Sequence, residues 1–125
     1  VVGSDIDPMA VAKARENIRV NGVVAQMRAY KSRGLDAVAV RRQGPFGLVL
    51  ANILARPLER LAPLIAAHRT PGAPVILSGL LREQEPQVIA AYRRAGLFLH
   101  AGEFVFPLVI VGITEASTTR SPWIP

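Results

Sequence analysis

The 125-residue sequence has no cysteine and only two histidines. Without cysteine there are no disulfides or thiolate metal sites, and His68 and His100 lack the spacing of zinc ligands, so we expect no metal. The chain also lacks a basic N-terminal region followed by an apolar core, and no apolar run reaches the length of a membrane span. These absences predict a cytoplasmic protein with no membrane partner.

Positive charge, in contrast, is plentiful. Fifteen lysines and arginines, nearly all of them arginine, face nine acidic residues, which gives a net charge of +6. Such a balance is typical of nucleic-acid binding. However, the arginines are scattered over the whole chain, without long runs and without interleaved aromatic residues. We therefore interpret them as solvated helix faces and expect no direct nucleic-acid contact, with a dedicated nucleic-acid patch as the alternative.

Apolar runs alternate with helical repeats along the chain, which predicts an α/β fold with a mostly parallel sheet. The expected strands are 1–5, 25–30, 46–52, 73–78, 97–101 and 104–113, and the expected helices are 8–20, 57–67 and 82–94. The continuous apolar run 46–52 favours a strand buried on both faces. Because only Gly102 and Glu103 separate the last two strands, these should form an antiparallel hairpin. We expect one domain over 1–114 and a flexible tail over 115–125.

Polar residues and a glycine follow the expected strands where each strand ends. Asp5 ends the first strand, and Asp7 before a proline predicts a helix N-cap. In nucleotide-binding βαβ units, a carboxylate placed like Asp5 accepts hydrogen bonds from ribose hydroxyls. Asn52 and Ser78 should share the edge where α/β sheets bind ligands. Asn52 would then orient a ligand amine or, alternatively, cap the next helix.

Four segments together resemble the bacterial methyltransferases that modify large-subunit ribosomal protein eleven. They are residues 5–8, 14–22, 51–55 and 76–84. The resemblance extends to about residue 113. It implies a Rossmann-like class I methyltransferase domain, here a C-terminal fragment of the catalytic domain that lacks the first strand and the Gly-rich loop. In that case strands 1–5 and 46–52 either pair directly, or the isolated chain folds poorly, and we expect it to be inactive alone.

The resemblance also implies a cofactor site for S-adenosylmethionine, the methyl donor. Asp5 would bind the ribose, and Ile6 would pack on the adenine unless it belongs to the core. Asn52 would contact the cofactor and orient the acceptor amine. Methyl transfer is a direct displacement that depends on alignment, so the absence of a nucleophilic catalytic set does not argue against an enzyme.

The acceptor site implied by the resemblance adds Ile53 and Leu54 as pocket lining, with Ser78 and Gly79 on the substrate. Gly79 would alternatively serve only to turn the chain. The acceptor would be a lysine or N-terminal amine of a large-subunit ribosomal protein, and the complete enzyme a monomer. Two alternatives stay open. One is a methyltransferase for release-factor glutamine or an RNA base, although residues 53–55 lack the Pro-Pro-Tyr typical of those enzymes. The other is a non-catalytic, basic RNA- or ribosome-binding module.

Overall fold

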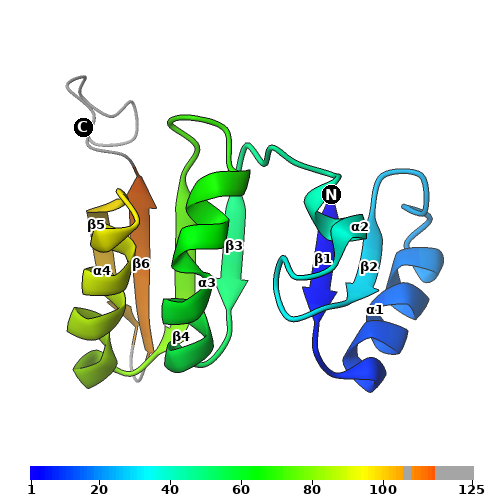
Figure 1. Ribbon diagram of the computed structural model, residues 1–125. Coiled ribbons are helices and arrows are strands. Elements are labelled where there is room, and N and C mark those ends of the chain that lie inside the picture. The colour runs from blue at the N-terminus through cyan, green and yellow to red at the C-terminus, as the bar shows by residue number, and fades with distance from the viewer. Residues whose placement is uncertain (106–107, 115–125) are drawn as a thin grey trace. The chain divides into compact units, whose positions relative to one another are not determined.

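A computed structural model describes residues 1–105 and 108–114 of the chain, with side chains as far as His100 (Figure 1). The chain divides into two compact units, Val1–Pro45 and Phe46–Pro125. The described strands form one two-stranded and one four-stranded sheet. One of the two expectations for strands 1–5 and 46–52 was that they pair directly, and this is wrong, because β1 and β3 belong to different sheets.

The first unit is a βαβ unit followed by a short helix. Its elements are β1 (Val2–Asp5), α1 (Pro8–Val20), β2 (Arg28–Lys31) and α2 (Val38–Arg41). The two strands are parallel, as predicted. Helix α1 begins where Asp7 Oδ1 accepts a hydrogen bond of 2.9 Å from the Met9 amide, and it ends at Asn21 before Gly22, whose φ is 68°. Both ends of α1 are therefore those that the sequence predicted.

A small apolar core holds this unit together. Val11, Ile18 and Ala29 are buried, and Ala14, Val23 and Met27 pack against them. The core brings the buried stripe of α1 against β2. Strand β1, expected to be buried, is half-buried at its start and exposed at its end, because β2 is its only hydrogen-bonded neighbour among the described strands. The expected strand 25–30 is β2, displaced toward the C-terminus.

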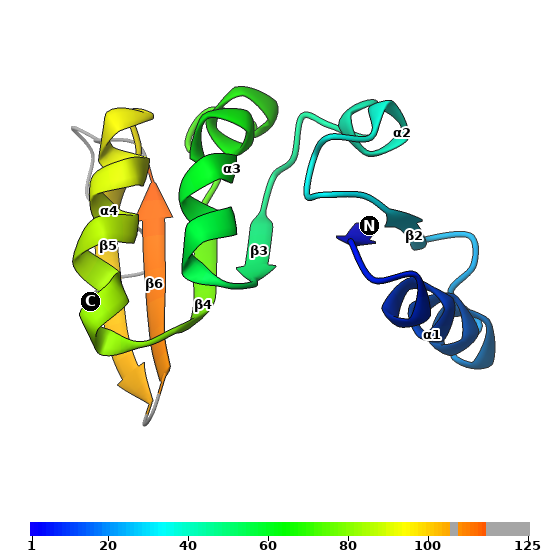
Figure 2. The ribbon, with the colours of Figure 1, turned by 60° about the horizontal axis from the view of Figure 1, so that its bottom comes forward.

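The second unit is a sheet with two helices on one face. Its elements are β3 (Val49–Asn52), α3 (Ala55–His68), β4 (Val75–Leu80), the 3₁₀ turn η1 (Arg82–Gln84), α4 (Glu85–Arg94), β5 (Phe98–Val105) and β6 (Leu108–Thr114). The strand order is β3-β4-β6-β5, in which β3 and β4 are parallel and β6 is antiparallel to β4 and β5. Figures 1 and 2 show α3 and α4 over the same face of this sheet. The predicted α/β architecture with a final hairpin is confirmed.

The core of the second unit lies between its helices and β4. Its fully buried large side chains are those of Leu58, Val75, Leu77, Leu80, Val88, Tyr92 and Leu97. Burial of each such aliphatic side chain contributes about 1.5–3 kcal/mol. The core therefore fixes β4 and, through its register with β4, the end of β3.

Two sequence-based expectations for this unit, the start of β3 and the position of the hairpin turn, are wrong. The strand expected over 46–52 is regular only from Val49, and Leu48 and Leu50 are 50% and 68% exposed, because α3 covers one face and no described helix of this unit covers the other. Gly102 and Glu103 were expected to form the hairpin turn, but they lie inside β5, paired with Val111 and Ile110. The two strands are joined through 106–107, and the expected tail over 115–125, like 106–107, lies outside the described residues.

Candidate functional site

The predicted ribose ligand, Asp5, ends β1 directly before the first turn of α1. Its Oδ1 accepts a hydrogen bond of 2.9 Å from the Asp7 amide. The carboxylate is exposed, and its Oδ2 has no hydrogen-bond partner within the described part of the chain. One oxygen thus fixes the orientation of the group, while the other is open to accept a hydrogen bond from a ligand hydroxyl.

Ile6, the residue beside this carboxylate, is also open to solvent. Its side chain is 66% exposed, so the alternative that Ile6 belongs to the core is wrong. Asp7 instead points back into α1 as the N-cap. The end of β1 therefore presents a carboxylate next to a branched apolar surface, which suits a ligand with hydroxyls and an adjoining flat ring.

In the second unit, the predicted acceptor residues meet at one edge of the sheet. The parallel register places Asn52, the last residue of β3, opposite Ser78 of β4, so the two residues lie side by side, as predicted, although β4 was expected to end at 78 and continues to Leu80. Gly79 follows Ser78 with φ of 80°, a backbone conformation that side chains other than glycine rarely adopt. The pairing of β4 with β6 shifts register between Leu77 and Leu80. Gly79 is thus part of a β-bulge, a feature that often redirects a side chain beside a functional site.

The Asn52 amide depends on this bulge. A Cβ added at Gly79 would collide with Asn52 Oδ1. Only glycine at position 79 leaves the space that the amide occupies. The positive φ of Gly79 agrees with the turning role that the sequence suggested, whereas its contact with Asn52 was not predicted.

Asn52 is not the cap of the following helix, which was the alternative to a ligand role. The N-cap of α3 is Leu54, and no side chain makes a capping hydrogen bond there. The Asn52 side chain is exposed and forms no hydrogen bond within the described part of the chain. Its amide therefore keeps both its acceptor oxygen and its donor nitrogen for a ligand.

The loop between β3 and α3 is apolar and accessible. Ile53 is 39% exposed and Leu54 is 76% exposed, and Ser78 next to them is half-buried. These residues, with Asn52 and Gly79, form the acceptor edge of the second unit. Asp5 and Ile6 form the donor edge of the first unit. These names follow the predicted roles, and the residues of each edge all come from one unit.

Further chemistry on these edges is limited. The described residues contain no cluster of three His, Asp or Glu side chains that would hold a metal ion. They also contain no helix long and apolar enough to cross a membrane. What each edge offers is hydrogen bonding and apolar contact.

Comparison with known proteins gives a consistent match. A family model described as ribosomal protein L11 methyltransferase (PrmA) matches residues 1–103. The ribosomal protein L11 methyltransferase of Bradyrhizobium diazoefficiens is 56% identical over 97 residues, which are 78% of this chain and 33% of the relative. The chain spans about a third of the length of the curated relatives it matches.

Solved structures agree in fold. The ribosomal protein L11 methylase of Lactobacillus delbrueckii subsp. bulgaricus superposes with a TM-score of 0.82 at 27% identity, covering 92% of this chain and 57% of that one. An RNA methyltransferase of Salinibacter ruber, solved in complex with S-adenosyl-L-homocysteine, superposes with a TM-score of 0.65 at 18% identity, covering 96% of this chain and 69% of that one. At 18% identity, the likeness to the Salinibacter ruber enzyme supports the fold alone and not a shared activity.

Proposed function

Because the chain belongs to the ribosomal protein L11 methyltransferase family, we propose that it takes part in methyl transfer from S-adenosylmethionine to an amine of a large-subunit ribosomal protein. The observation that carries this proposal is the pair of open hydrogen-bonding groups at strand ends, the Asp5 carboxylate and the Asn52 amide. We place the reaction in the cytoplasm and assign it to a monomer.

The donor edge would hold the cofactor. Asp5 Oδ2 would accept a hydrogen bond from the ribose, while Oδ1 stays fixed on the Asp7 amide. Ile6, which is exposed beside it, would pack on the adenine. When bound, S-adenosylmethionine supplies the methyl group on a positively charged sulfur.

The acceptor edge would hold the amine. The Asn52 oxygen would accept a hydrogen bond from the neutral amine and so orient its nitrogen lone pair for methyl transfer. Ile53 and Leu54 would line the approach, and Ser78 would lie on the opposite side. No covalent intermediate with the protein is needed, because the amine displaces the sulfur directly and then loses a proton to water.

Calorimetric titration of S-adenosylhomocysteine tests the donor edge, and it uses a protein of the curated relatives' length that contains this chain, because the chain alone is expected to be inactive. Asp5→Asn retains an oxygen for the Asp7 amide but removes the charge and one acceptor, so the affinity should fall about 10- to 100-fold, the value of a hydrogen bond to a charged group. Asp36→Asn, which removes an exposed carboxylate elsewhere in the same unit, is the control and should have no effect. Equal affinity of the wild type and Asp5→Asn would refute the assignment of Asp5.

The acceptor class needs a separate assay. Radiolabelled methyl donor is supplied with the ribosomal protein, with a release factor, or with RNA. Labelling of the ribosomal protein supports the proposal. Labelling of only the release factor or only the RNA would show that the acceptor edge serves one of the alternative acceptors instead.

A further inference from the structure

A groove in the first unit has no part in the proposed reaction. It runs between α1 and β2, which lie side by side in Figures 1 and 2, and it has a cavity volume of about 440 Å³. Its lining comes from α1, from the loop that follows and from β2, and consists of Arg15, Ile18, Arg19, Val24, Met27, Arg28, Ala29 and Tyr30. We call it the α1–β2 groove.

The α1–β2 groove is strongly cationic. Three of its lining residues are arginines, and none is acidic. The nearby acid on α1, Glu16, already forms an ion pair of 2.8 Å with Lys13. The sequence spreads its arginines over the whole chain, but the fold gathers Arg15, Arg19 and Arg28 around a single hollow. An occupant of this groove must therefore carry several negative charges.

Arg15 also occupies a hydrogen-bonding group on the edge of β2, to which a peptide strand would otherwise pair. The Arg28 amide donates to the Val1 carbonyl at 3.0 Å on the β1 side, so the next residue, Ala29, directs its carbonyl to the free edge of β2. Arg15 Nε donates to this Ala29 carbonyl at 3.0 Å. An acidic peptide thus cannot add as a further strand at this position, and strand addition is the usual source of affinity for an extended peptide.

The rest of the groove surface, between the arginines, is suited to contact with nucleic-acid bases. There the groove presents the exposed side chain of Val24 and the half-buried side chains of Met27 and Tyr30, over the buried Ile18. Single-stranded nucleic acid is held by this combination of cations on the phosphates with apolar and aromatic contact to the base faces. Arginine is particularly suited to phosphate because its planar guanidinium donates two parallel hydrogen bonds.

We infer that the α1–β2 groove binds single-stranded RNA, with Arg15, Arg19 and Arg28 on successive phosphates and Met27 and Tyr30 against the bases. Binding at this groove goes beyond the methyl-transfer function. It uses no residue of the donor or acceptor edge, so it does not depend on the methyl donor.

The test is fluorescence anisotropy of a labelled single-stranded RNA of about ten nucleotides, a length within the site sizes of single-strand binders. The variant Arg19→Gln/Arg28→Gln removes two exposed guanidiniums and leaves Arg15 on the Ala29 carbonyl. We expect it to weaken binding at least 10-fold. Its salt dependence, the slope of log K against log salt, should be shallower by roughly 0.7 for each arginine removed.

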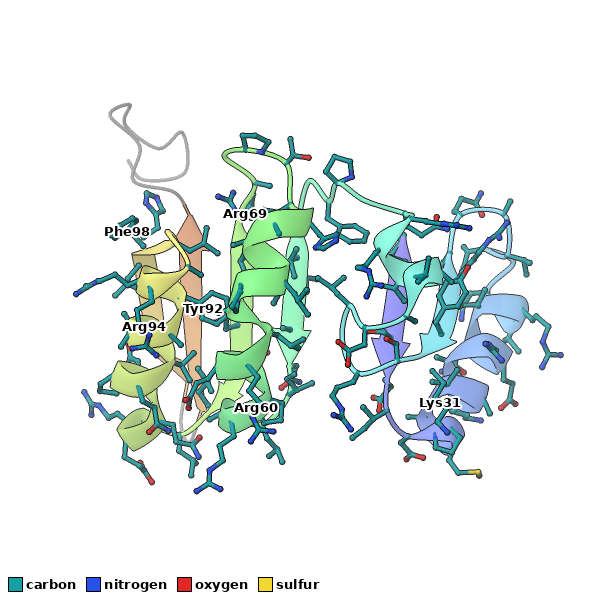
Figure 3. All side chains as sticks on the ribbon, in the orientation of Figure 1. Lys31, Arg60, Arg69, Tyr92, Arg94 and Phe98 are labelled. Carbon is teal, nitrogen blue, oxygen red and sulfur yellow. The ribbon has the colours of Figure 1, made fainter. Side chains whose placement is uncertain are left out.

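The matched control is Arg93→Gln/Arg94→Gln, which removes the same charge from exposed positions of α4 in the second unit. Figure 3 shows Arg94 on the outside of that helix. The control should bind RNA with nearly the wild-type affinity. An equal loss in both double variants would show that binding follows net charge and not the groove, and would overturn the inference.

Competition separates RNA from an acidic protein partner. Poly-glutamate should displace the RNA only at a large excess, because it offers no base faces. If poly-glutamate displaces the RNA at an equal concentration of negative charge, and if poly-glutamate does not bind the Arg19→Gln/Arg28→Gln variant, the groove would be assigned to an acidic peptide. Absence of RNA binding by the wild-type chain at low salt would also refute the inference. Circular dichroism of each variant verifies that it is folded.

Discussion

The side-chain oxygen of Asn52 lies against Gly79, in the place that the Cβ of any other residue at position 79 would need. The two residues come from neighbouring parallel strands, one step apart in register, because Asn52 faces Ser78. The bulge at Gly79 therefore decides where the Asn52 amide lies. The contact makes Gly79 a positioning residue for the proposed acceptor site.

In a protein of the curated relatives' length that contains this chain, Gly79→Ala should lower methyl transfer strongly and far more than it lowers donor affinity. The new methyl group must displace the Asn52 amide, and the positive φ of 80° adds about 1–2 kcal/mol of backbone strain. Gly96→Ala is the matched control, since Gly96 has φ of 84° but nothing within 4 Å of its added Cβ. If both variants lose the same activity and the same stability, backbone strain alone accounts for the effect. Turnover, S-adenosylhomocysteine titration and urea unfolding provide the three readouts.

In the same longer protein, Asn52→Ala should reduce turnover at least 10-fold and far more than it reduces donor affinity, with little change in the free energy of unfolding. The amide has no hydrogen bond within the described part of the chain, so its removal costs the fold less than about 0.5 kcal/mol. A group that acts only on the acceptor in the transition state changes kcat without changing cofactor binding. A loss confined to donor affinity would instead assign Asn52 to the cofactor.

Much of the fold follows from local signals that the structure confirms. Asp7 before a proline fixes the start of α1, and Gly22 fixes its end. Alternation of apolar runs and helices was sufficient to identify the strands β3 and β4 and the final antiparallel hairpin. These features depend on short-range capping and on hydrophobic periodicity, which are visible in the sequence alone.

What the sequence did not provide depends on neighbours in space. Leu50 has the apolar character of a buried strand residue, yet it is exposed because one face of its sheet carries no described helix of the unit. The pairing of Gly102 inside β5 is decided by its partner strand and not by its turn propensity. The same holds for the site. Asn52 and Gly79 were each identified, but their contact arises from the register of two strands 27 positions apart in sequence.

Asp7→Ala should destabilise the first unit by about 1 kcal/mol, the usual value of an N-cap, because the Met9 amide loses its acceptor. It should leave S-adenosylhomocysteine affinity nearly unchanged, in contrast to Asp5→Asn. Thermal unfolding followed by circular dichroism measures the first effect and calorimetry the second. A large loss of donor affinity would mean that Asp7 itself contacts the ligand. Asp36→Ala, at an exposed position that caps no helix, controls for the removal of one negative charge.

Tyr92→Phe should stabilise the second unit. Tyr92 is fully buried in the core beside α3 (Figure 3), and its hydroxyl has no hydrogen-bond partner within the described part of the chain. A buried hydroxyl without a partner costs about 1–3 kcal/mol, so its removal should raise the free energy of unfolding by roughly 1 kcal/mol at pH 7. Tyr30→Phe, at a half-buried tyrosine of the first unit, is the control and should have a smaller effect.

The same hydroxyl predicts a pH dependence. Burial raises the pKa of Tyr92 above its ordinary value of 10.0. The unfolded chain then loses this proton at lower pH than the folded chain, so the contribution of Tyr92 to stability is constant below pH about 10 and falls as the pH rises further. The stability advantage of Tyr92→Phe over the wild type should therefore widen between pH 9 and pH 11, measured by urea unfolding at each pH. An advantage that stays constant across this range would show that the hydroxyl reaches water in the folded state.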